Sequence, residues 1–195
     1  MKISAKITQQ IQCFPEGTSF GYSELAIDRK DFLSAAKTLE RLQKKGLIRK
    51  LAKGKFYKPK RTPFGEKKPD EEQVIKPYLY QQGKRIAYIT GEYLYNQLGL
   101  TTQVPAVLKI ASRGRRISIN LSAIKATAVK SYAEVTEENY QLLGFLDALK
   151  DLKHIPDLDI KNALIIINNR LKQLTEPQRR SMIDYALAYP PRVRA

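Results

Sequence analysis

Residues 28–57 read DRKDFLSAAKTLERLQKKGLIRKLAKGKFY, and their first half has the periodicity of an amphipathic helix. At about 100° per residue, the apolar side chains gather on one side of that helix. They are Phe32, Ala35, Ala36, Leu39 and Leu42. The opposite side carries cations and hydroxyl groups and has no acid at its centre. It consists of Lys30, Ser34, Lys37, Arg41 and Lys45, with Thr38 and Lys44 on its edges. We predict a helix that opens at Asp28 and runs to about Lys45, with Gly46 just past its end.

Two short β-prone runs follow this helix, on either side of a turn that contains Gly54. They predict a basic hairpin over residues 47–58. Before the helix, the isoleucines of residues 3–11 recur at helical spacing, and Ser23 can cap a short helix over 24–27. Three helices followed by a basic hairpin describe a winged helix-turn-helix. In that fold the third helix enters the DNA major groove and the hairpin flanks it.

The positive charge of the chain is concentrated near its N-terminus. The 195 residues include 35 Lys+Arg against 19 Asp+Glu, a net charge of +16. Residues 1–61 carry +10 of this excess, and residues 41–61 contain ten basic side chains and no carboxylate. A localised basic surface attracts a polyanion, because each phosphate that it neutralises releases counterions. We therefore predict binding to double-stranded promoter or operator DNA. The predicted contacts are Arg29, Lys30, Ser34, Lys37, Thr38, Arg41 and Lys45 on the third helix, and Lys53 and Lys55 on the wing.

Two prolines and a glycine in residues 59–65 interrupt any regular element, and a polar stretch follows them. This pattern predicts a DNA-binding domain over residues 1–61, a linker over 62–72 and a second domain over 73–195. The expected fold class is α+β, with an N-terminal winged helix-turn-helix followed by a mixed α+β domain that has a helical C-terminal end. The elements expected after the boundary are a helix over 70–82 bent at Pro77, strands over 85–90 and 124–131, a helix over 91–98, and a hairpin formed by 106–112 and 115–121.

The helical end of the chain carries recognisable caps. Thr136 and Asp159 each precede a predicted helix, and Thr175 with Gln178 makes a capping box at the start of the last one. In the helix after Asp159, a set of apolar side chains has the spacing of a core-facing stripe. These are Ala163, Leu164, Ile167, Leu171 and Leu174.

The sequence lacks the common catalytic signatures, namely Gly-x-Gly-x-x-Gly, the phosphate loop and His-Glu-x-x-His. Its single histidine, His154, and its single cysteine, Cys13, cannot supply a zinc tetrad. Asp147 and Asp151 lie four residues apart on a helix and could pair in a site, although partnership with nearby lysines or solvent is the favoured interpretation. We expect a protein that is not an enzyme and that needs no cofactor or metal.

Three arginines, Arg113, Arg115 and Arg116, surround Gly114 at the tip of the hairpin expected over 106–121. Guanidinium groups at a hairpin tip can grip phosphate, and they can equally form a solvated turn that protects the strand edges. Both interpretations are open.

The cellular location follows from what the sequence lacks. No apolar run approaches the roughly 18 residues that a membrane span needs, and the N-terminus lacks the apolar stretch of a signal peptide. A lone cysteine cannot form an internal disulfide. The chain is therefore expected to be soluble and cytoplasmic, with no membrane partner.

Two parts of the sequence are similar to a known family. The first comprises Ser23-Glu24-Leu25, then Leu42, Leu47, Ile48 and Arg49, and finally residues 54–57; the second is residues 88–105, YITGEYLYNQLGLTTQVP. Together they resemble the AbiEi-like antitoxin family of bacterial type IV toxin–antitoxin systems, over nearly the full length of the chain. Residues 88–105 look like the strand, glycine-initiated helix and Gly-Leu-Thr turn that open the family's C-terminal domain. The resemblance implies a DNA-binding autorepressor whose second domain counteracts a nucleotidyltransferase-like toxin encoded beside it.

A bacterial DNA-binding transcriptional regulator and antitoxin is therefore the leading hypothesis. One alternative is an RNA-binding accessory protein that uses Arg113, Arg115 and Arg116 as a second basic surface. Another is an enzymatic second domain that acts on a nucleotide or on the toxin, which convergent carboxylates in a pocket would support. A competition between double-stranded DNA and structured RNA at fixed salt separates the first two hypotheses.

Overall fold

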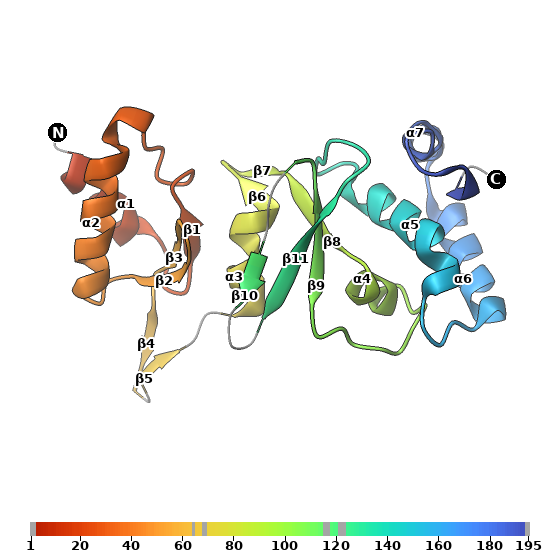
Figure 1. Ribbon diagram of the computed structural model, residues 1–195, viewed down its shortest axis with the longest axis horizontal. Coiled ribbons are helices and arrows are strands. Elements are labelled where there is room, and N and C mark those ends of the chain that lie inside the picture. The colour runs from red at the N-terminus through yellow and green to blue at the C-terminus, as the bar shows by residue number, and fades with distance from the viewer. Residues whose placement is uncertain (1–2, 64, 68–69, 115–117, 121–123, 194–195) are drawn as a thin grey trace. The chain divides into compact units, whose positions relative to one another are not determined.

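The computed structural model describes residues 3–63, 65–67, 70–114, 118–120 and 124–193 (Figure 1). It divides the chain into two units, residues 1–83 and 84–195. Both units combine helices with strands, which confirms the expected α+β class and its helical C-terminal end. The first unit contains 18 basic and nine acidic side chains, a net charge of +9; the second contains 17 and ten, a net charge of +7.

The first unit places helices on one antiparallel sheet. Its helices are α1 (Ile3–Cys13), the 3-10 helix η1 (Arg29–Asp31), α2 (Phe32–Lys44) and α3 (Glu71–Leu79). Its sheet has the order β1 (Ser19–Gly21), β3 (Lys55–Tyr57), β2 (Arg49–Ala52), and β4 (Lys60–Thr62) pairs with β5 (Gly65–Lys67); β6 (Tyr80–Gln81) follows α3. Apolar side chains of α1, α2 and the sheet form one core. It consists of Ile7, Ile11, Phe20, Leu25, Ala35, Leu39, Leu42, Ile48 and Phe56.

The helix predicted before the hairpin is confirmed as α2, and local hydrogen bonds set its end. It starts at Phe32, directly after η1. At the other end Gly46 has a φ of 68°, and its N–H donates to the Gln43 carbonyl at 2.9 Å. The Leu47 N–H donates to the Leu42 carbonyl at 3.0 Å. This pair of bonds is a Schellman motif, which favours glycine at the left-handed position.

The short helix predicted over residues 24–27 is wrong, because these residues form a turn and its exit. The Glu24 carboxylate accepts hydrogen bonds from the Gly21 N–H at 2.7 Å and from Ser23 Oγ at 2.9 Å. Such local side-chain bonds compete with helical ones, and Ala26 has a φ of 45°, outside the right-handed helical region. The winged helix-turn-helix assignment of the first unit therefore stays a prediction.

Helix α3 packs on β1 and belongs to the first unit. The sequence analysis predicts a linker over 62–72 and a second domain from residue 73, which would place most of α3 in the second domain. Val74 and Ile75 of α3 are buried. Ser19 Oγ of β1 donates a hydrogen bond to the Gln73 carbonyl. The first unit extends beyond the predicted linker because the apolar side of α3 needs the sheet to cover it.

The second unit contains a sheet of order β10-β11-β9-β8 with helices packed against it (Figure 1). The strands of that sheet are β8 (Ala87–Thr90), β9 (Leu108–Ser112), β10 (Ser118–Asn120) and β11 (Lys125–Lys130). The unit also contains the short strand β7 (Lys84–Arg85), which lies outside this sheet. Its helices are α4 (Glu92–Gln97), α5 (Tyr140–Asp151), α6 (Ile160–Gln173) and α7 (Glu176–Ala186), with the 3-10 helices η2 (Leu152–His154) and η3 (Pro191–Val193).

The hairpin predicted from residues 106–112 and 115–121 is wrong, because β11 lies between β9 and β10. Strand β11 pairs in parallel with β9, with Ala128 opposite Ile110, and antiparallel with β10. At this central position the backbone of β11 forms hydrogen bonds with both neighbouring strands, whereas a hairpin of β9 and β10 would leave β11 at an edge.

The predicted helix caps have mixed outcomes. Asp159 is confirmed, because its carboxylate accepts hydrogen bonds from two backbone N–H groups in the first turn of α6. The capping box of Thr175 and Gln178 at the start of α7 is also confirmed. Thr136 is wrong as an N-cap: its N–H donates to Asn139 Oδ1 at 2.8 Å, which supports a turn, and α5 begins only at Tyr140.

The core-facing stripe predicted on α6 is also wrong. Ala163 is the buried residue of this helix, and it packs with Tyr95 and Leu100. Leu164, which has the same helical periodicity, is 58% exposed. Apolar spacing indicates that one side of a helix is apolar, but it does not determine whether another element covers that side.

Candidate nucleic-acid interface

Most of the predicted DNA-contacting side chains lie on the exposed side of η1 and α2. Arg29 and Lys30 are exposed on η1, and Ser34, Lys37 and Arg41 are exposed on α2. Lys45, the C-cap residue, is exposed directly after them. Glu40 is also exposed on α2, and it pairs at 2.9 Å with Lys44, which the wheel placed on the edge of this side.

Thr38 is a correction to the predicted interface. Its side chain is only 5% exposed, and its Oγ1 donates to the Ser34 carbonyl at 2.8 Å. A hydroxyl bonded to the carbonyl one turn earlier can be buried at low cost, so a position on the edge of the polar side packs inward.

Leu33 is an exposed residue that sequence reasoning missed. It lies in the first turn of α2, beside Ser34 and one turn before Lys37, and its side chain is 81% exposed. An apolar side chain at this position can contact the methyl group of thymine in the major groove. Phe32 was expected in the core, but it is partly exposed and stacks on Tyr22 with ring centroids 4.4 Å apart.

The hairpin predicted over residues 47–58, which the sequence analysis interpreted as a wing, is confirmed as the antiparallel pair β2 and β3. Its two-residue turn contains Lys53 and Gly54, and Gly54 has a φ of 71°, a left-handed conformation that favours glycine. Lys53 is exposed. Lys55 instead donates from Nζ to the Pro77 carbonyl at 2.7 Å and lies 5.3 Å from the Tyr78 ring centroid. Lys55 therefore contacts α3, and Lys53 is the exposed cation of the predicted pair.

A second hairpin, β4–β5, is held against the wing by one carboxylate. Glu66 of β5 accepts hydrogen bonds from Arg49 Nη2 at 2.8 Å and from the Tyr57 hydroxyl at 2.8 Å. The hydrogen bonds from Arg49, followed by that from Tyr57, lower the pKa of Glu66. Burial and then Glu66 raise the pKa of Tyr57 to about 12, so its hydroxyl stays protonated and donates. Lys60 and Arg61 on β4 are exposed cations that the sequence analysis placed before a linker.

The possible second basic surface is only partly described. Arg113 follows β9 and is exposed. Arg115 and Arg116 lie outside the described residues. The hairpin at whose tip the three arginines were expected does not form, because β11 lies between β9 and β10.

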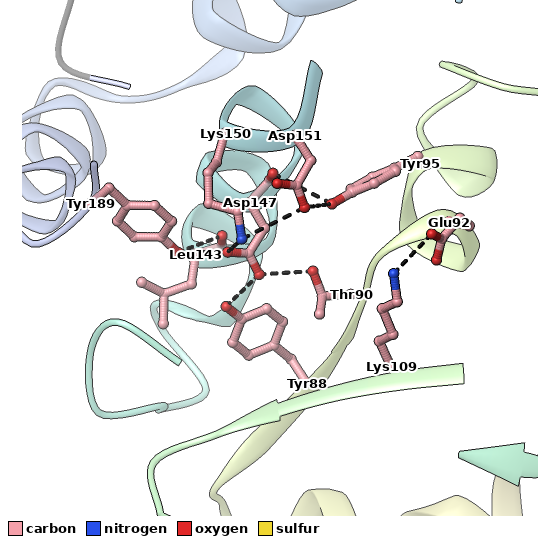
Figure 2. A network of polar contacts seen from close by, with 10 residues as sticks. All are labelled: Tyr88, Thr90, Glu92, Tyr95, Lys109, Leu143, Asp147, Lys150, Asp151 and Tyr189. Atoms are coloured by element: carbon pink, nitrogen blue, oxygen red, sulfur yellow. Dashed lines mark hydrogen bonds and ion pairs between the residues drawn. The ribbon is translucent and has the colours of Figure 1, made fainter. Parts of the chain in front are cut away.

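In the second unit, a buried acid is surrounded by hydroxyl donors (Figure 2). Asp147 of α5 is 4% exposed, and it accepts hydrogen bonds from Tyr88 at 2.9 Å and Thr90 at 2.7 Å, both on β8. Tyr189 lies 3.1 Å from its other oxygen, and Lys150 Nζ lies 3.7 Å away. We call these five residues the Asp147 network.

The contacts of the Asp147 network favour a structural role. Burial raises the pKa of Asp147, although hydrogen bonds from Thr90, Tyr88 and Tyr189 and the charge of Lys150 oppose this effect. Burial likewise raises the pKa of the two tyrosines, so they remain protonated donors. The Tyr88 and Thr90 hydroxyls point at the carboxylate, and the Tyr189 hydroxyl lies 3.1 Å both from it and from the Leu143 carbonyl. Together these contacts join β8, α5 and the segment after α7.

A catalytic pair of Asp147 and Asp151 is not what this geometry favours. Asp151 accepts a separate hydrogen bond from Tyr95 at 2.7 Å. Lys150 Nζ lies 3.6 Å from Asp151, which agrees with the favoured interpretation that these aspartates pair with nearby lysines. The sequence analysis missed that Asp147 is buried. Its position four residues after Leu143, on the apolar side of α5, was the available signal.

Metal ligation has no candidate cluster among the described residues: no three His, Cys, Asp or Glu side chains there could hold an ion. Cys13 and His154 are both exposed and lie in different units. Among the described helices, none is both long and apolar enough to cross a membrane.

Fold and surface together define a two-unit α+β protein whose first unit carries an exposed basic helix beside a basic hairpin. The chain belongs to a family of unknown function, DUF6088, whose model matches residues 6–175. No curated protein matches the chain.

Proposed function

We propose that the first unit binds double-stranded DNA, with α2 in the major groove and the β2–β3 hairpin beside it on the phosphates. One observation carries this proposal: the exposed side of η1 and α2 presents cations that have no carboxylate partner among the described residues. They are Arg29, Lys30, Lys37, Arg41 and Lys45. Unpaired cations that follow one another along η1 and α2 form an electrostatic surface for a polyanion.

The geometry of α2 fits the roles of its side chains. A major groove about 12 Å wide admits an α-helix. In this arrangement Ser34 and Arg41 reach base edges, while Lys37 and Lys53 contact phosphates. The Schellman motif ends α2 before the wing, and the two-residue turn keeps Lys53 at the tip of the hairpin.

The second part of the proposal is that DNA binding is regulatory, in a bacterial antitoxin of the AbiEi-like class. Its support is the resemblance of residues 88–105, which form most of β8, then Gly91, then α4. A Cβ at Gly91 would lie 2.7 Å from Lys109 Cδ, and Gly91 has a φ of 72°, so this junction favours glycine. Co-expression with a nucleotidyltransferase-like gene beside its own tests this part. Survival on toxin induction supports it, and unchanged cell death contradicts it.

The salt dependence of binding tests the DNA proposal. Lys30, Lys37, Arg41, Lys45 and Lys53 offer roughly five phosphate contacts, so log K should fall against log salt with a slope of about −4 to −5. Fluorescence anisotropy of a labelled promoter fragment at several salt concentrations measures this slope. A slope near zero would mean that this side of α2 is only solvated.

A matched pair of lysines provides the control. Lys37→Ala should weaken binding and reduce the slope by about one. Lys6→Ala removes the same charge from an exposed site on α1 and should leave both unchanged. Structured RNA as competitor distinguishes the alternative: stronger competition by RNA than by random duplex DNA would favour the RNA-binding hypothesis.

A further inference from the structure

Helix α6 of the second unit presents an apolar stripe to solvent. Ile160 is 67% exposed and Leu164 is 58% exposed, and Ile167 and Leu171 are partly exposed. At about 100° per residue, these four side chains lie within one narrow arc of the helix. We call them the α6 stripe.

The α6 stripe is separate from the contacts that attach the helix to its unit. Ala163 and Ile166 make those contacts, and they pack with Tyr95, Leu100 and Ala148. Along the stripe the steps are four, three and four residues, which is the spacing of the apolar seam in a two-helix coiled coil. A surface with this spacing is complementary to a second amphipathic helix lying along α6.

Charge indicates which kind of helix fits. Helix α6 contains Lys161, Arg170 and Lys172 and no acidic residue. All three cations are exposed, and none has an ion-pair partner among the described residues. Lys161 and Arg170 flank the stripe at the positions where coiled-coil partners form interhelical ion pairs. A second copy of α6 would place cations opposite cations, and the unit as a whole carries +7.

We propose that the α6 stripe binds an amphipathic helix of a protein partner, with Glu or Asp beside that partner's apolar seam. The site lies in the second unit and does not depend on DNA binding by the first. It assigns an interaction surface to the segment that the sequence analysis expected to be buried.

A synthetic probe tests the proposal with the full-length chain. The probe is a fluorescein-labelled helix of about three heptads with Leu at the seam positions and Glu at the flanking positions. A second probe has Lys in place of every Glu. Anisotropy titrations at low and physiological salt should show binding of the Glu probe at least about tenfold tighter than that of the Lys probe.

Two neighbouring residues give matched variants. Leu164 lies in the stripe and Ile165 lies about 100° away from it, and they are 58% and 59% exposed. Leu164→Glu should weaken binding of the Glu probe at least about tenfold, because it puts a buried charge in the seam. Ile165→Glu adds the same charge at an equally exposed site and should change it less than about threefold. A thermal melt checks that both variants fold.

Three results would overturn the proposal. The first is equal binding of the two probes, and the second is an equal effect of the two variants. The third is a different occupant of the stripe. It would be a second copy of the chain if sedimentation shows a dimer that Leu164→Glu dissociates. It would be a membrane if the chain binds anionic vesicles, Leu164→Glu abolishes that binding and the Glu probe does not compete with it.

Discussion

At the scale of single residues, Asp147 shows how the second unit accommodates a buried charge. Burial disfavours an ionised carboxylate, and hydrogen bonds to it offset that cost. Here the donors come from Tyr88 and Thr90 on β8 and from Tyr189 after α7. Asp147 therefore joins three segments that are distant in the sequence.

Replacement of Asp147 by its amide tests this role. Asp147→Asn keeps the size of the side chain but turns one acceptor into a donor, which leaves a buried hydroxyl without its acceptor. We expect the free energy of unfolding to fall by about 1–3 kcal/mol, measured by urea denaturation. Asp184→Asn makes the same chemical change at an exposed site on α7, and it should change stability by no more than about 0.5 kcal/mol. An equal effect of the two variants would contradict the structural role.

The pKa of Asp147 also predicts a pH dependence. Its folded-state pKa is raised above the ordinary value of 3.8, mainly by burial, so the folded protein holds this proton more tightly than the unfolded chain. The wild-type protein should therefore gain stability relative to Asp147→Asn as pH falls from neutral toward 3.8. Denaturation of both proteins at several pH values measures this difference. A difference that shrinks on acidification would mean that the hydrogen bonds outweigh burial.

At the scale of elements, Glu66 fixes the β4–β5 hairpin relative to the wing. Arg49 and Tyr57, its two partners, lie on β2 and β3. The Arg49 and Glu66 side chains are 47% and 28% exposed, so solvent screens the pair and its contribution to global stability is small. The ion pair acts locally, because it keeps the β4–β5 hairpin ordered.

Glu66→Gln should therefore loosen the hairpin without unfolding the first unit. Amide hydrogen exchange of β4 and β5 should become faster, because the charge-assisted bonds from Arg49 are lost, while exchange in α2 should stay unchanged. Glu40→Gln removes another exposed ion pair, that with Lys44, and serves as the control. Unchanged exchange in the hairpin would show that backbone pairing alone holds it.

At the scale of the whole molecule, the position of α3 predicts where the chain can be divided. A fragment of residues 1–83 retains the cover that α3 gives to the sheet, whereas residues 1–61 lose it together with the partners of Ser19 and Lys55. The longer fragment should melt at a clearly higher temperature, and it should keep the salt slope of the full chain. Circular dichroism and anisotropy measure these two properties. Equal melting temperatures would mean that α3 contributes nothing to the first unit.

Residues 84–195 should fold by themselves, because they contain complete apolar clusters and the Asp147 network. Without residues 1–83 they should not repress a promoter. Repression by the second fragment alone would contradict the proposed role of α2.

Several features that depend on neighbours in the sequence were predictable, although the helix over 24–27 and the cap at Thr136 were not. The end of α2 at Gly46, the turn at Gly54 and the caps at Asp159 and Thr175 each depend on hydrogen bonds that span only a few residues. The α+β class follows from summed periodicities, which tolerate errors at single positions.

Features that depend on distant partners were decided only by the tertiary structure. Lys55 carries the same charge as Lys53, but its Nζ donates to the Pro77 carbonyl, 22 residues away, so it contacts α3 while Lys53 is exposed. Asp147 meets Thr90 across 57 residues, and β11 displaces the expected hairpin because it pairs with both of its strands. The stripe on α6 has core periodicity but lies at the surface. The sequence by itself determined which side chains are apolar or charged and where helices end; which of those surfaces are covered depends on packing between elements, which no local pattern encodes.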